Sequence, residues 1–153
     1  MFAMVVDISG SDAEQKQSIR KAALEIFQAL SKSGNQGYLT LFNEEVAISG
    51  APITPERAES NLEKVFFHGG TALYDAIRQT ADKLNESKNQ NFHRRLMVVV
   101  SDGEDNASRL SAKQLEPIVQ KDGVAVYVLL IPVKHSGTQV DHVKAISRDS
   151  GGT

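Results

Sequence analysis

The chain has 153 residues, of which 41% are hydrophobic and 24% are charged, and its formal net charge is −2 at pH 7. This length and composition are typical of one globular domain with a sizeable core. The small negative charge excludes the strongly basic character of a nucleic-acid or anionic-membrane binder. No apolar run approaches the roughly 20 residues that a membrane helix needs, so we expect no membrane insertion. Cysteine is absent, which excludes disulfides and thiolate metal sites.

The first predicted element is a strand that ends at an aspartate. The residues up to Val6 are apolar, and they lead into an Asp-x-Ser-x-Ser motif formed by Asp7, Ser9 and Ser11. A continuous apolar run predicts a strand that is buried on both faces. Ligands bind at the carboxyl ends of strands in open α/β sheets, and a carboxylate with two hydroxyls suits a hard cation, Mg²⁺ before Ca²⁺ or Mn²⁺. Helix capping by Ser and Asp is the alternative, and this motif alone does not decide between the two.

The next elements are a helix, a hairpin and a second helix. A strand over residues 37–42 and a turn into residues 45–49 predict a hairpin, which adds one antiparallel edge strand to the sheet. Thr54 followed by Pro55 predicts the start of the second helix. We expect the first helix to bury Ile19, Ala22, Ala23, Ile26, Phe27 and Leu30, and the second to bury Ala58, Leu62, Val65 and Phe66.

The second half of the chain alternates helices and strands. Gly69, Gly70 and Thr71 form a loop that leads directly into a helix, and a strand over residues 95–101 runs into Asp102. A helix that begins after Ser111, a very apolar strand over residues 124–131 and a helix over residues 138–148 complete the series. This order predicts an α/β fold with a mostly parallel sheet and helices on both faces.

Taken together, these motifs resemble the von Willebrand factor A-type domain, in its bacterial form, and its metal-ion-dependent adhesion site. That site consists of Asp-x-Ser-x-Ser, a distant Thr and a distant Asp, and it is matched in order by Asp7, Ser9, Ser11, Thr71 and Asp102. The resemblance implies that the three hydroxyls contact the metal, while the two aspartates act largely through water. It also implies a Rossmann-like open sheet with one antiparallel edge strand.

A cation held mainly by neutral hydroxyls keeps a coordination position for an outside anion. The resemblance therefore implies a protein-binding module, as in adhesion, in which bound Mg²⁺, or Mn²⁺ or Ca²⁺, accepts a Glu or Asp side chain from a partner protein. We expect no enzyme, because no His or Cys nucleophile and no P-loop accompany the site. Two alternatives stay open: a scaffold subunit of an ATP-driven chelatase-like or assembly complex, and a metal-dependent phosphoester hydrolase with Glu104 or Asp105 as its base. An extracytoplasmic or cell-surface location is the expectation.

Two features depart from the family pattern. Asp12 stands where the family often has an apolar residue, and we expect it to charge the first turn of the helix. Residues 104–106 read as a solvated acidic turn, and Asp75 as support for its own helix start.

Family members carry one more strand and a last helix, so we expect residues 1–153 to be a single domain truncated at its C-terminus. Residues 124–131 would then be a bare sheet edge, which predicts a homodimer or an element swap through that edge.

Overall fold

The structure is a computed structural model that describes residues 1–10, 15–32, 34–86, 94–132 and 139–152. The strands are β1 (Phe2–Asp7), β2 (Gly37–Phe42), β3 (Val46–Ile48), β4 (Arg95–Ser101) and β5 (Val124–Leu130). The helices are α1 (Lys16–Ser31), α2 (Pro55–Lys64), α3 (Leu73–Glu86), α4 (Ala112–Asp122) and α5 (Gln139–Asp149). Within these described ranges, no helix is long and apolar enough to cross a lipid bilayer.

The described strands form one sheet in the order β3-β2-β1-β4-β5. β1 pairs in parallel with β2 and β4, β4 pairs in parallel with β5, and β3 runs antiparallel to β2. The predicted α/β fold, with a mostly parallel sheet and one antiparallel edge strand, is confirmed. All six residues of β1 are buried, as expected of a central strand covered on both faces.

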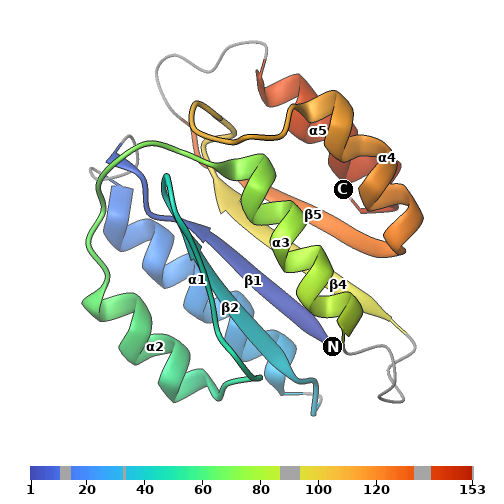
Figure 1. Cartoon of the computed structure of the whole chain (residues 1–153). Coiled ribbons are helices and arrows are strands. Elements are labelled where there is room, and N and C mark those ends of the chain that lie inside the picture. Colours follow the sequence, from blue (N-terminus) through green and yellow to red (C-terminus); the bar gives the residue numbers. More distant parts are fainter. Residues whose placement is uncertain (11–14, 33, 87–93, 133–138, 153) are drawn as a thin grey trace.

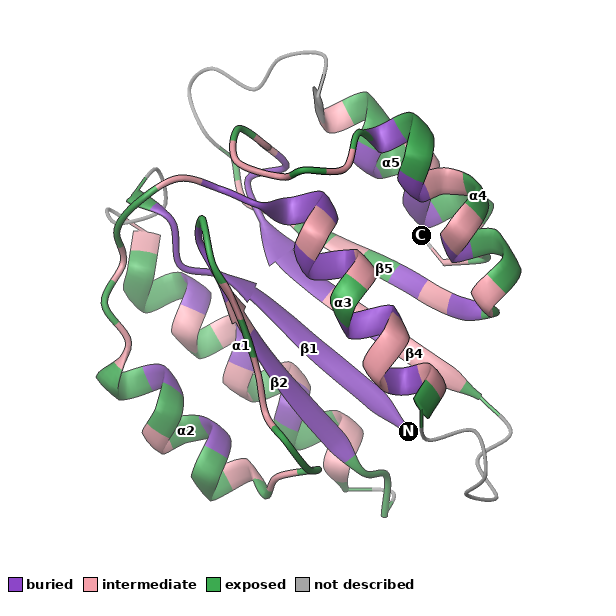
Figure 2. Ribbon diagram, viewed as in Figure 1, coloured by how far each residue is buried: buried purple, intermediate pink, exposed green. Residues whose placement is uncertain are grey.

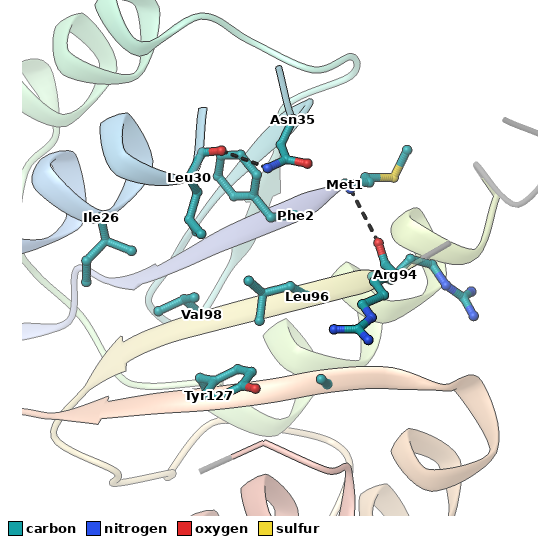
Figure 3. Close-up of a pocket in the computed structure, with 11 residues that line it drawn as sticks. Met1, Phe2, Ile26, Leu30, Asn35, Arg94, Leu96, Val98 and Tyr127 are labelled. Carbon is teal, nitrogen blue, oxygen red and sulfur yellow. Dashed lines mark hydrogen bonds between the residues drawn. The ribbon is translucent and has the colours of Figure 1, made fainter. Parts of the chain in front are cut away.

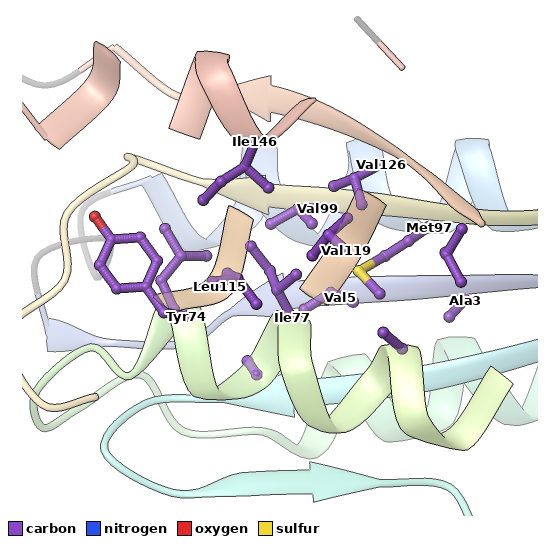
Figure 4. Packing of buried hydrophobic residues seen from close by; sticks show 14 of the residues in the cluster. Ala3, Val5, Tyr74, Ile77, Met97, Val99, Leu115, Val119, Val126 and Ile146 are labelled. Atoms are coloured by element: carbon purple, nitrogen blue, oxygen red, sulfur yellow. The ribbon is translucent and has the colours of Figure 1, made fainter. Parts of the chain in front are cut away.

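Helices cover both faces of the sheet (Figure 1). Successive side chains of a strand point to opposite faces, so β1 contributes to two separate cores. Phe2, Met4 and Val6 pack with the buried faces of α1 and α2. Ala3 and Val5 pack with α3 on the other face, in a cluster that continues to α4 and α5 (Figure 4). Figure 2 shows β1 buried along its whole length, and β2 is buried except at Leu41, which is intermediate.

The second helix ends earlier than the apolar spacing of the sequence predicts. Thr54 is the N-cap, as expected, and Ala58 and Leu62 are buried. The helix ends at Lys64, however, and Val65 has an extended backbone, with φ −73° and ψ 142°. In an extended segment neighbouring side chains point to opposite sides, so Phe66 faces solvent and is 82% exposed. The prediction that Phe66 lies on the inward face of this helix is wrong.

β5 forms an edge of the described sheet, as predicted, but that edge is not bare along its whole length. The N–H of Val126 donates to Ser150 Oγ at 2.9 Å, and the hydroxyl of Ser147 donates to the carbonyl of Val126 at 2.7 Å. Gly152 lies so close to the Val126 backbone that a Cβ would overlap it. The end of α5 therefore covers the first half of the edge. Further along the strand, no hydrogen bond between described residues takes the outward backbone groups of Val128 and Leu130.

An apolar hollow of about 480 Å³ lies beside β5 on the face that carries α1. Figure 3 shows its lining: Ile26 and Leu30 come from α1, Leu96 and Val98 from β4, and Tyr127 from β5. Tyr127 is 37% exposed and its neighbour on the same face, Leu129, is 42% exposed. Helix α1 therefore leaves this part of the sheet uncovered within the described structure.

Candidate functional site

Three loops meet at the carboxyl edge of the sheet. They follow β1, precede α3 and follow β4, and backbone hydrogen bonds connect them. Gly10 of the first loop donates to the carbonyl of Gly69 in the second, at 3.1 Å. Asn106 of the third loop donates to the carbonyl of Thr71 in the second, at 2.9 Å. The parallel pairing of β1 with β4 explains why the loops that follow them lie at the same edge.

Four of the five residues that the sequence predicts for the site lie at this edge and are buried: Asp7, Ser9, Thr71 and Asp102. Asp7 ends β1, and Ser9 follows it in the same loop. Thr71 and Asp102 come from the second and third loops. The fifth residue, Ser11, lies outside the described residues, as does Asp12.

Asp7 is held by hydrogen bonds on both carboxylate oxygens. The N–H of Ser9 donates to Oδ1 at 2.9 Å, and the hydroxyl of Ser101 donates to Oδ2 at 2.7 Å. Burial raises the pKa of Asp7 to about 6, against the opposing effect of hydrogen bonds from Ser101 and Ser9. The negative charge of Asp102 raises the pKa further, so the two carboxylates lie close enough to repel each other.

Asp102 is the second buried carboxylate at this edge of the sheet. The residue is 1% exposed, and its Oδ1 accepts the N–H of Glu104 at 2.9 Å. Its Oδ2 is buried and has no hydrogen-bond partner among the described residues. A buried, unpaired carboxylate oxygen is costly, and a bound cation or its water would satisfy it.

The donors at this edge suit a hard cation. They are carboxylate and hydroxyl oxygens, which Mg²⁺, Mn²⁺ and Ca²⁺ prefer over softer metals. Within the part of the chain that the structure describes, no group of three or more His, Cys, Asp or Glu side chains is placed to hold a metal. A cation at this edge would therefore need the hydroxyls of Ser9 and Thr71 as well as the carboxylates.

The loop after β4 also caps helix α3. Asn106 Oδ1 accepts the N–H of Thr71 at 2.8 Å, and Asp105 Oδ2 accepts the N–H of Tyr74 at 3.0 Å. Ser108 Oγ accepts the N–H of Asp75 at 3.0 Å. We call these three acceptors, Asp105, Asn106 and Ser108, the α3 cap. The expectation of a solvated acidic turn over residues 104–106 is incomplete: Asn106 is exposed, but the side chains of Asp105 and Asn106 also accept hydrogen bonds from the backbone before and within α3.

Asp75 of α3 also accepts hydrogen bonds from the loop after β4, so the two segments bind each other reciprocally. Its Oδ2 accepts the N–H of Arg109 at 3.0 Å, and its Oδ1 accepts the N–H of Leu110 at 3.1 Å. Asp75 therefore fixes the loop after β4 rather than only its own helix start. The sequence did not predict this arrangement, because Arg109 and Leu110 lie 34 and 35 residues after Asp75 along the chain. The one hint in the sequence was that Asp105, Asn106 and Ser108 are residue types that often cap helices, although no helix begins directly after them.

The two glycines before Thr71 lie between the side chains of Glu44 and Asn106. Gly70 donates its N–H to Glu44 Oε2 at 2.7 Å, and Gly69 has a φ of +79°. A Cβ at Gly69 would overlap the Glu44 carboxylate, and a Cβ at Gly70 would lie 2.8 Å from Asn106 Oδ1. The positive φ favours glycine at position 69, and a side chain at position 70 would displace the Asn106 amide that accepts the Thr71 N–H. Glu44, in the β2–β3 turn, is a second contributor that the sequence motifs did not indicate.

Comparisons with known proteins agree with this architecture. The family model of the von Willebrand factor type A domain matches residues 3–152. No curated protein sequence matches the chain. Similar solved structures include an aerotolerance-related membrane protein from Bacteroides fragilis, with a TM-score of 0.71 and 18% identity over 99% of this chain and 88% of that one.

Two further structures share the fold. The conserved hypothetical protein BatB from Bacteroides thetaiotaomicron has a TM-score of 0.71 and 20% identity over 99% of this chain and 86% of that one. The pilus adhesin SpaC from Lactobacillus rhamnosus GG, in an open conformation, has a TM-score of 0.75 and 15% identity over 98% of this chain and 27% of that one. At these identities the likeness concerns the fold alone.

Proposed function

Since the chain belongs to the von Willebrand factor type A domain family, we propose that it is a metal-dependent protein-binding module. Domains of this family commonly mediate protein–protein interactions and typically bind a divalent metal. In our proposal the cation is Mg²⁺, with Mn²⁺ or Ca²⁺ as alternatives, and it is held by Asp7, Ser9, Ser11, Thr71 and Asp102. The bound ion would supply an electrophilic position for a Glu or Asp side chain of a partner protein.

The observation that carries this proposal is the unsatisfied Oδ2 of Asp102 beside the buried carboxylate of Asp7. Two buried negative charges that repel each other are unfavourable unless a positive charge lies with them. The buried hydroxyl residues Ser9 and Thr71 lie at the same edge of the sheet and offer neutral oxygen ligands. If the hydroxyls contact the cation and the two carboxylates act largely through water, as the resemblance implies, the cation would keep a coordination position for a further anion.

We further propose that the protein does no catalysis itself and acts outside the cytoplasm or at the cell surface. The ATP-driven scaffold and the phosphoester hydrolase stay predictions from the sequence. The hydrolase alternative would be supported if the purified protein turned over a phosphoester in the presence of Mg²⁺ and the Asp7→Ala variant did not.

The metal site is tested by calorimetric titration of Mg²⁺ and Mn²⁺ into protein that has been stripped with EDTA. We expect binding to one site, and we expect Thr71→Ala to weaken it by about tenfold or more, because one ligand is lost. Thr54→Ala is the matched control, since Thr54 caps α2 through the N–H of Arg57 and lies outside the site. A folded protein that takes up neither ion would overturn the proposal, and so would equal affinities in the Thr71→Ala variant and the unchanged protein.

A further inference from the structure

Phe66 is the most exposed large hydrophobic side chain among the described residues, at 82%. It lies in the extended segment between α2 and the Gly69 loop, where neighbouring side chains alternate between core and solvent. Val65 and Phe67 pack against the core on the α1 face, while Phe66 and His68 are exposed. An exposed strip therefore runs from Phe66 through His68 towards Thr71.

This segment is fixed to the rest of the fold at both ends. Arg20 donates to the carbonyl of Val65 at 2.7 Å, and its guanidinium lies 5.5 Å from the ring centre of Phe67. At the other end, the N–H of His68 donates to the carbonyl of Ile8 at 2.9 Å. Phe66 is thus presented on an ordered backbone, which lowers the entropy cost of using it in a contact.

Phe66 lies within reach of any protein that binds the candidate site. Thr71 is five positions further along the chain, and an extended chain covers at most about 18 Å over five residue steps. A standard interface buries roughly 800 Å² on each partner, which corresponds to a disc about 16 Å in radius. The two lengths are comparable, so a partner whose carboxylate enters the site can extend over the Phe66 side chain with an interface of ordinary size.

The recess beside Phe66 contains two cationic side chains. Lys16 and Arg20 line a small recess beside it, of about 120 Å³, together with Val65, Phe66 and Phe67. Positive charge beside an exposed aromatic ring suits an acidic partner and speeds its association. Buried aromatic side chains at the centre of an interface often carry much of its binding energy.

We propose that Phe66 is an aromatic anchor for the partner, and that the partner is an acidic protein segment with an apolar contact for this ring. One acidic side chain of that segment enters the metal site, its apolar part covers Phe66, and its remaining negative charge lies near Lys16 and Arg20. This inference rests on the proposed function, because it states that the segment which binds the metal site extends from that site over Phe66.

The test selects peptides from a random 12-residue library displayed on phage, in the presence of Mg²⁺, and elutes them with EDTA. We expect the eluted peptides to combine acidic residues with at least one apolar residue. The affinity of one synthetic, fluorescently labelled peptide is then measured by anisotropy. Phe66→Ser should weaken its binding by roughly tenfold or more, as for a central aromatic contact.

Two variants complete the design. Tyr127→Ser is the matched control, since it also removes an exposed aromatic ring, and we expect it to leave the affinity unchanged. Lys16→Glu should weaken the binding at low salt, and the difference should shrink at high salt, because the charge contact is screened. Equal peptide affinities for Phe66→Ser and the unchanged protein would overturn this inference alone. A library without any EDTA-eluted peptide would overturn the proposed function, and the inference with it.

Discussion

Asp7 and Asp102 show how two residues of the same charge are accommodated at the edge of a sheet. Asp7 receives hydrogen bonds from Ser9 and Ser101 on its two oxygens. Asp102 receives one from Glu104 and keeps one buried oxygen without a partner among the described residues. The repulsion between the two carboxylates is therefore compensated only in part by protein groups, and the free energy of unfolding should depend on a bound cation.

The substitution Asp102→Asn separates these effects. In EDTA we expect it to raise the free energy of unfolding by about 1 kcal/mol, because it removes one of two repelling charges and keeps an acceptor for Glu104. The unchanged protein should gain about 2.7 kcal/mol when Mg²⁺ is present at a hundred times its dissociation constant, and the variant should gain nothing. Urea unfolding at neutral pH, with EDTA or with Mg²⁺, measures both quantities. A variant that is less stable in EDTA yet still stabilised by Mg²⁺ would contradict this account.

At the scale of elements, helix α3 takes its N-terminal partners from a distant loop. The α3 cap binds N–H groups of Thr71, Tyr74 and Asp75, and these partners are 31 to 35 residues away along the chain. The same loop begins with Asp102. The cap therefore sets the position of Thr71 relative to Asp102, which are two of the proposed ligands.

Asn106→Ala tests this role. Loss of the acceptor for the Thr71 N–H should cost about 1 to 2 kcal/mol of stability, as for other helix caps, and should weaken Mg²⁺ binding by about tenfold through the displacement of Thr71. In a Thr71→Ala background the stability cost should persist, while the effect on Mg²⁺ affinity should vanish. Calorimetry and urea unfolding of the four proteins give this double-mutant cycle.

Ser111→Ala is the control for that cycle. Ser111 belongs to the capping box of α4 with Gln114, so its loss should cost a similar amount of stability and leave Mg²⁺ affinity unchanged. If both cap variants weakened Mg²⁺ binding equally, the effect would be one of general stability, and the positioning role of Asn106 would be refuted.

These contacts also mark the limit of what the sequence could predict. The strands, the hairpin, the Thr54 cap and the Ser111–Gln114 box follow from local periodicity and local cap signals, and the structure has all of them. The roles of Glu44, Asp105 and Asn106 depend on partners in other elements, which no local pattern specifies. Phe66 was misplaced because apolar spacing continues past Lys64, whereas the backbone leaves the helix there.

For the molecule as a whole, the candidate site and the apolar hollow occupy separate regions of the sheet. The site lies at the carboxyl edge, whereas the hollow is lined by residues near the amino ends of β1 and β4, such as Phe2 and Arg94. A partner at one does not have to displace a partner at the other. The predicted self-association stays a prediction, and the structure narrows the edge it would use to residues 128–130.

Val128→Pro tests that edge. The N–H of Val126 points away from β4 and is taken by Ser150, so the N–H of Val128, two residues on, also points outward. Proline is tolerated in an edge strand where the N–H faces out, so the fold should persist while pairing with a second copy is lost. Light scattering across a concentration series should show dimers of the unchanged protein and monomers of the variant. A monomer at every concentration for the unchanged protein would refute the dimer.

The central place of β1 has a consequence for how the chain is made. Its neighbour β4 is translated long afterwards, since Asp7 and its partner Ser101 are 94 residues apart. At ribosomal rates of about 5 to 20 residues per second, this gap corresponds to roughly 5 to 20 s. During that interval a strand with six buried residues has no partner on one side. The nascent chain is then most open to aggregation, and a chaperone that shields β1 should raise the yield of native protein.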